Sequence, residues 1–195
     1  HLIHISTDYV FDGTLDRPYR EDDSVGPASV YGASKLAGER AALDVLGDRA
    51  TIVRTSWVCG EHGGNIVKTA LRLAAAGTSL AFVDDQIGHP TFTADLAPAL
   101  LTLAADVAED SGAGGIVHLT NSGIVSWYVF VREVLIAAGH DPTSVSAIST
   151  DELDPPRPAP RPANSVSAAS RIACRFAAGS IVRFRGAAIG ECSSK

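Results

Sequence analysis

Two short stretches decide the fold of this sequence: Ser6-Thr7-Asp8-Tyr9-Val10-Phe11 and Tyr31-Gly32-Ala33-Ser34-Lys35. Tyr31 and Lys35 are four residues apart, so on a helix they share one face, one turn from each other. A lysine ammonium beside a phenol stabilises the phenolate and lowers the phenol pKa from about 10 toward neutral pH. The spacing would allow Tyr31 to act as a general acid supported by Lys35, but by itself it is more typical of a solvated surface pair.

Thr7 lies at the end of an apolar run, Leu2-Ile3-His4-Ile5, which predicts a buried strand. In open α/β sheets, the carboxyl ends of the strands face the ligand crevice. We therefore expect the Thr7 hydroxyl to share a substrate carbonyl with Tyr31.

The order of the predicted elements indicates an α/β fold. Ser29 is a suitable N-cap for a helix that runs to Leu46 and ends at Gly47, and residues 51–55 form the next short, β-branched strand. Strand, helix and strand in this order are typical of a doubly wound parallel sheet. Further helices are predicted at 65–76, 94–108 and from 127 until Gly139, with strands at 80–83, 116–119 and 145–148.

The helix after Ser29 is expected to bury one face against the sheet and to expose the other to solvent. Its apolar residues near the carboxyl end are expected to face the sheet. Its charged residues in the same stretch are expected to be wetter. The first group is Ala41, Ala42, Val45 and Leu46, and the second is Glu39, Arg40 and Asp44.

Composition excludes several classes of protein. With 195 residues, 46% of them hydrophobic and 19% charged, the chain can form one globular core. No apolar run approaches the roughly 18 residues of a membrane span, and His1 does not begin a signal peptide. The net charge of −6 argues against nucleic-acid binding. Three cysteines without metal-ligand spacing favour a reducing cytoplasm and argue against a structural zinc.

The motifs S-T-D-Y-V-F-D-G (6–13) and E-D-D-x-x-x-P-x-x-x-Y-G-x-S-K-x-x-G-E (21–39) resemble the extended short-chain dehydrogenase/reductase family, and within it the dTDP-4-dehydrorhamnose reductases. Later segments resemble the same family in the same order, over residues 1 to about 166. These segments are R-T-S-W-V (54–58), the helix that begins at Asn65, D-Q-x-G-x-P-T (85–91) and R-P-x-x-S (161–165).

The resemblance implies a Rossmann-like doubly wound parallel sheet with a small substrate-binding α/β portion. It implies reduction of the 4-keto group of dTDP-4-dehydro-L-rhamnose by NADPH or NADH. Thr7, Tyr31 and Lys35 would be catalytic, with Tyr31 and Lys35 also holding the cofactor. Ser56 would bind the cofactor, and Trp57, Asn65 and Arg161 would bind the dTDP-sugar. A homodimer is compatible with the family, and so is Mg²⁺, for which no ligands are identifiable.

Each of these later residues also has a plain structural interpretation. Trp57 can pack in the core instead of stacking on a nucleotide. Asn65 can be a helix N-cap, and Arg161 can be solvated. The D-Q-x-G-x-P-T segment can be a turn shaped by glycine and proline.

The sequence departs from the family pattern in several places. The Gly-x-x-Gly-x-x-Gly loop for the dinucleotide and an initiator methionine are both absent, so we expect a fragment that lacks about 90 amino-terminal residues and the first strands of the sheet. Residues 1–60 would be the last part of the NAD(P)-binding domain, and 61–166 the rest of the sheet with the substrate portion. Residues 167–195 form an atypical tail, for which an altered reading frame is one hypothesis. Cys59 stands where the family usually has tyrosine.

Other functions remain open. Epimerases and dehydratases of the family share the Tyr/Lys pair, but dehydratases usually carry Asp-Glu after the threonine, whereas Asp8-Tyr9 follows Thr7 here and favours reduction. A non-catalytic nucleotide-binding subunit, like the regulatory partner of methionine adenosyltransferase, is a further alternative. The fragment itself can also lack activity.

Overall fold

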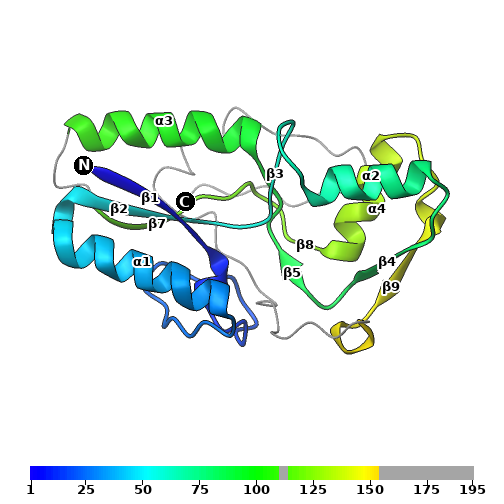
Figure 1. The fold of residues 1–195 in the computed structure, drawn as a ribbon, viewed down its shortest axis with the longest axis horizontal. Coiled ribbons are helices and arrows are strands. Elements are labelled where there is room, and N and C mark those ends of the chain that lie inside the picture. The colour runs from blue at the N-terminus through cyan, green and yellow to red at the C-terminus, as the bar shows by residue number, and fades with distance from the viewer. Residues whose placement is uncertain (110–113, 154–195) are drawn as a thin grey trace, which may run out of the picture.

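The computed structural model describes residues 1–109 and 114–153. Its central feature is a parallel sheet of three strands, β1 (Leu2–Thr7), β2 (Ala50–Thr55) and β7 (Gly115–His118), in the order β1-β2-β7. Figure 1 shows α1 (Val30–Leu46) and α3 (Thr93–Glu109) on opposite faces of this sheet. The predicted doubly wound α/β arrangement is confirmed.

β2 is the central strand, and all six of its residues are buried. Its neighbours are in parallel register, with Thr7 of β1 opposite Thr55 and His118 of β7 opposite Arg54. The carboxyl ends of the three strands therefore lie along one edge of the sheet, where a doubly wound fold places its ligands.

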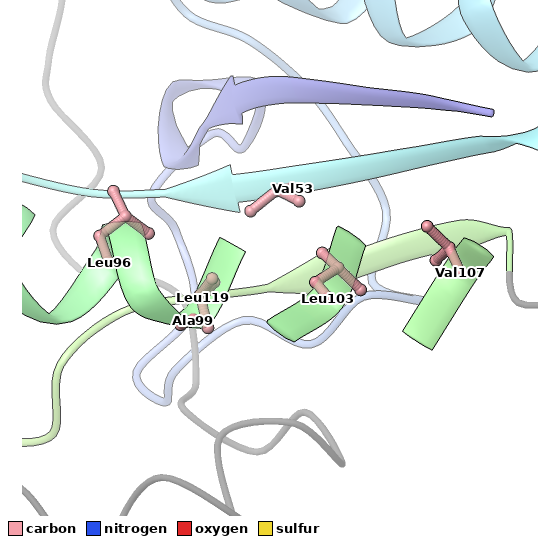
Figure 2. Packing of buried hydrophobic residues seen from close by; sticks show 6 residues of the cluster. All are labelled: Val53, Leu96, Ala99, Leu103, Val107 and Leu119. Carbon is pink, nitrogen blue, oxygen red and sulfur yellow. The ribbon is translucent and has the colours of Figure 1, made fainter. Parts of the chain in front are cut away.

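One face of the sheet is closed by α3. Apolar side chains recur on this helix at intervals of three or four residues, which places them on one face. They pack on the central strand and on the end of β7, as Figure 2 shows. The cluster comprises Val53, Leu96, Ala99, Leu103, Val107 and Leu119.

α1 covers the other face and has the predicted ends. The Ser29 side chain accepts a hydrogen bond from the Gly32 N–H, and the helix ends at Gly47, whose φ of 53° is in the left-handed region. The expectation for the two faces of this helix was correct for Arg40 and Asp44, which are exposed, but wrong for Glu39 and Val45. Glu39 is only 1% exposed, whereas Val45 is 77% exposed. Glu39 is buried because Arg54 of the central strand pairs with it.

A second group of elements lies beside the sheet in Figure 1. β4 (Leu80–Val83) pairs in parallel with β9 (Val145–Ile148), and both predicted strands are confirmed. α2 (Ile66–Ala75) and α4 (Trp127–Ala137) pack against this pair. Their shared core consists of Ala70, Leu80, Val131, Leu135 and Val145.

Short elements link the two groups. β3 (Val58–Cys59) pairs in parallel with β6 (Thr91–Phe92), and β5 (Ile87–Gly88) pairs in antiparallel with β8 (Val125–Ser126). The sequence did not predict these two-residue strands, because they are too short to show a period. The remaining elements are single turns of 3₁₀ helix, η1 (Asp8–Val10), η2 (Gly47–Arg49), η3 (Pro142–Ser144) and η4 (Thr150–Glu152). None of the helices within the described ranges is long and apolar enough to cross a membrane.

Candidate functional site

The beginning of α1 lies directly against the turn that follows β1. Thr7 is buried, accepts a hydrogen bond from the Tyr9 N–H at 3.3 Å and donates one to Asp8 Oδ1 at 3.1 Å. Gly32 comes so close that a Cβ there would lie 2.1 Å from the Tyr9 carbonyl oxygen. This contact fixes where the first turn of α1, which carries Tyr31, meets the end of the strand.

Tyr31 and Lys35 lie near this junction. The Tyr31 side chain is 55% exposed, and its ring meets the Tyr9 ring edge to face, with centroids 5.7 Å apart. Lys35 is half-buried, and its Nζ donates a hydrogen bond to the Ile5 carbonyl at 2.6 Å. The structure thus gathers Thr7, Tyr31 and Lys35 around the end of β1. Within the described residues, the lysine bonds to the strand and not to the Tyr31 hydroxyl.

Ser56 follows β2 at the same edge of the sheet. It is buried, and its hydroxyl donates a hydrogen bond to the His89 carbonyl at 2.9 Å. The register that places Thr55 opposite Thr7 puts Ser56 beside the turn after β1. A role for Ser56 in cofactor binding stays a prediction.

Trp57 has a backbone conformation that is rare for a residue with a side chain. Its φ is 47°, and its ring stacks on Trp127 with centroids 3.6 Å apart and planes within 9°. A Cβ on Gly88 would lie 2.3 Å from Trp57 Cε2, so the close approach of the ring requires a glycine there. The packing role that the sequence left open is therefore present, and contact with a substrate stays a prediction.

Asn65 caps α2 and borders a cavity. Its Oδ1 accepts the Lys68 N–H at 3.2 Å, and its Nδ2 donates to the Gly60 carbonyl at 2.8 Å. The cavity has a volume of about 410 Å³. Its walls come from α2, β4, the start of α4 and the end of η4, and include Asn65, Phe82, Gln86, Trp127 and Leu153. Asn65 can serve as a cap and still present an edge to a ligand in this cavity.

The D-Q-x-G-x-P-T segment is fixed by polar contacts that the sequence did not reveal. Asp85 accepts hydrogen bonds from the Thr150 N–H at 2.8 Å and from the Thr150 hydroxyl at 2.7 Å. Gln86 Nε2 donates to the same hydroxyl at 3.0 Å. These bonds hold η4 next to the cavity.

Two buried polar groups near the sheet edge were also missed. Glu39 and Arg54 form a buried pair, with Arg54 Nη2 2.7 Å from Glu39 Oε2. His118 is fully buried, and burial, with a further contribution from Arg54, lowers its pKa to about 3. The sequence contained one signal for the ion pair. Arg54 is a charged residue in the predicted apolar strand 51–55, and a charged side chain in a buried strand needs a buried partner.

Some expectations have no counterpart in the described ranges. Arg161 and the tail at 167–195 lie outside the described residues. Within residues 1–109 and 114–153, no three His, Cys, Asp or Glu side chains gather as a metal site, so nothing supports Mg²⁺ binding. Cys59 is buried in the core, and burial raises the pKa of its thiol to about 11, so it does not form a polar rim contact.

Comparison with known proteins gives a consistent result. The sequence model described as "RmlD substrate binding domain" matches residues 1–186. A dTDP-4-dehydrorhamnose reductase from Streptomyces griseus is 46% identical over 170 residues, which cover 87% of this chain and 55% of that protein.

Two solved structures agree with this chain in fold. A dTDP-4-dehydrorhamnose reductase from Clostridium acetobutylicum shares 40% identity with a TM-score of 0.76, over 93% of this chain and 60% of that one. One from Bacillus anthracis, in complex with NADP, shares 36% identity with a TM-score of 0.73, over 84% of this chain and 55% of that one. This chain spans little more than half the length of these relatives. The sheet is Rossmann-like, as predicted, and the chain belongs to the RmlD substrate binding domain family.

Proposed function

We propose that the protein containing this chain reduces dTDP-4-dehydro-L-rhamnose to dTDP-L-rhamnose with NADPH. The observation that carries the proposal is the grouping of Thr7, Tyr31 and Lys35 around the carboxyl end of β1. The names of relatives at 36–46% identity support the substrate, and the NADP complex of one of them supports the cofactor.

The residues at this junction fit a nicotinamide cofactor and a keto sugar. NADPH, when bound, supplies the hydride that reaches the keto carbon. Tyr31, whose side chain is exposed, donates a proton to the oxygen of that carbonyl. The Thr7 hydroxyl, whose proton is donated to Asp8 in this structure, would turn to donate it to the same oxygen, where negative charge develops. Lys35, whose ammonium lies against β1 at Ile5, is proposed to hold a ribose hydroxyl of the cofactor and to support replacement of the proton lost by Tyr31.

The cavity beside α2 is the proposed place for part of the dTDP-sugar. It combines apolar walls, such as Phe82 and Trp127, with the amides of Asn65 and Gln86, which suits a partly apolar ligand with hydrogen-bonding edges. Arg161 is proposed to bind the pyrophosphate through paired N–H donors. The Trp57 ring is proposed to contact the sugar.

The test is direct. The full-length protein is incubated with dTDP-4-dehydro-L-rhamnose and NADPH, and the product is identified by NMR. Stoichiometric NADPH oxidation with formation of dTDP-L-rhamnose is expected. Conversion of dTDP-glucose without added NADPH would instead identify a dehydratase. Binding of nucleotide without turnover of either sugar would favour the non-catalytic alternative.

A further inference from the structure

The sheet contains a buried charge network that the proposed chemistry does not use. Glu39 of α1 accepts three hydrogen bonds from Arg54 of β2. Arg54 Nε donates to Oε1 at 3.0 Å and to Oε2 at 3.2 Å, and Nη2 donates to Oε2 at 2.7 Å. Glu39 also accepts a hydrogen bond from the Ser6 hydroxyl of β1. All three side chains are at most 4% exposed. One carboxylate therefore joins three separate elements.

Two residues of the network are close neighbours of the proposed catalytic residues. Ser6 immediately precedes Thr7, and Glu39 follows Lys35 by one turn of α1. Lys35 already binds the strand through the Ile5 carbonyl. α1 is thus attached to the last residues of β1 at two consecutive turns. Arg54, which lies opposite Ser6 in the register of β1 and β2 and has its guanidinium 5.0 Å from the centre of the Phe11 ring, binds the same carboxylate from the neighbouring strand.

A gain in stability alone is a weak explanation for such a network. Desolvation of two charges offsets most of their attraction, and apolar replacements of a buried pair are often neutral or stabilising. An apolar pair cannot reproduce directional hydrogen bonds. These bonds fix the position of α1 along β1. An error of about 1 Å in such an alignment can lower turnover by about 100-fold.

We propose that Ser6, Glu39 and Arg54 are positioning residues that fix α1 along the direction of β1, and thereby the positions of Tyr31 and Lys35 relative to Thr7. The proposal rests on the proposed reductase function for its kinetic consequence. Its structural consequence, the placement of α1 on β1, can be measured without turnover.

The main variant is Ser6→Ala, which removes the link to the strand and leaves the ion pair intact. A second variant, Glu39→Met with Arg54→Met, removes both charges together, so neither is left buried alone. The control is Thr51→Val, which removes another fully buried hydroxyl at the far end of β2. Circular dichroism verifies that each variant is folded.

We expect Ser6→Ala and the double variant to lower kcat by about tenfold or more, with the KM values for NADPH and the dTDP-sugar unchanged within about twofold. Thr51→Val should keep the wild-type kcat. Wild-type kcat in both network variants would overturn the proposal, and so would a change confined to KM, which indicates substrate binding.

The second readout is the NMR contact between the rings of Tyr9 and Tyr31, which meet edge to face in the structure. Its loss in Ser6→Ala, with retention in Thr51→Val, supports the positioning role. Its full retention in Ser6→Ala contradicts it. If the wild-type protein has no reductase activity, the proposed function fails and this contact alone decides the positioning role.

Discussion

Gly32 is the residue at which α1 comes closest to the turn after β1. Because a Cβ there would lie 2.1 Å from the Tyr9 carbonyl oxygen, Gly32→Ala must displace backbone. We expect the free energy of unfolding to fall by about 1–3 kcal/mol, as for other overpacked sites, and turnover to fall with it. Urea denaturation measures the first effect.

Gly38→Ala is the matched control on the same helix. Its Cβ would meet His4 Nε2 at 3.4 Å, an ordinary contact, and alanine favours the helix by up to about 1 kcal/mol. Equal stability of the two variants would show that the structure accommodates a Cβ at position 32 without strain.

His118 makes stability depend on pH. Burial lowers its pKa from 6.5 to about 3 in the folded chain, helped by the charge of Arg54. Between these values the unfolded chain binds a proton that the folded chain does not, so the free energy of unfolding falls as the pH decreases. Its contribution is complete above pH 6.5 and is lost progressively toward pH 3.

We expect a slope of up to about 1.4 kcal/mol per pH unit from His118 below its unfolded pKa. Urea denaturation at several pH values between about 7 and 5 measures it, because the carboxylates with lowered pKa values, such as Asp12 and Asp85, act at lower pH. His118→Leu should flatten the curve, leaving the part due to His89, whose pKa burial also lowers. An unchanged slope in His118→Leu would refute this assignment.

At the scale of elements, two variants of Asn65 distinguish its role as a helix cap from a role in ligand binding. Asn65→Ala removes the acceptor for the Lys68 N–H and should cost about 1 kcal/mol of stability. Asn65→Asp keeps the acceptor oxygen for the Lys68 N–H but loses the Nδ2 donor to the Gly60 carbonyl, so it should retain only part of that stability. It also replaces the amide N–H donor beside the cavity with a charge, so we expect it to weaken binding of the dTDP-sugar. Calorimetric titration with dTDP measures that loss, and unchanged affinity in Asn65→Asp would mean that Asn65 is only a cap.

The bounds of the helices could be predicted because their signals are local. Ser29 and Asn65 cap the helices that follow them, and Gly47 ends α1 with a left-handed backbone. The buried face of α1 could not be predicted in the same way. Glu39 is buried by a partner, Arg54, that lies fifteen residues away on another element, and helical periodicity alone treats it as a solvated charge.

At the scale of the molecule, the placement of Thr7, Tyr31 and Lys35 around the end of β1 could be expected from the order of the elements, and the contacts around them could not. Tyr9 connects Thr7 and Tyr31, because its N–H donates to the Thr7 hydroxyl and its ring contacts the Tyr31 ring at the start of the first long helix of the chain. The stack of Trp57 on Trp127 brings together residues seventy positions apart, in the region where the short strand pairs join the two groups of elements. No local signal encodes such a contact.

The reductase proposal depends most directly on Tyr31, and Tyr9 supplies a control whose ring contacts it. The measurement is the kcat of Tyr31→Phe and Tyr9→Phe in the full-length protein, with the Kd for NADPH determined by fluorescence. Loss of the proton donor should lower the kcat of Tyr31→Phe by about 100-fold or more, with NADPH affinity retained. Tyr9→Phe should keep most of its turnover. Wild-type turnover in Tyr31→Phe would contradict the assignment of Tyr31 as the general acid.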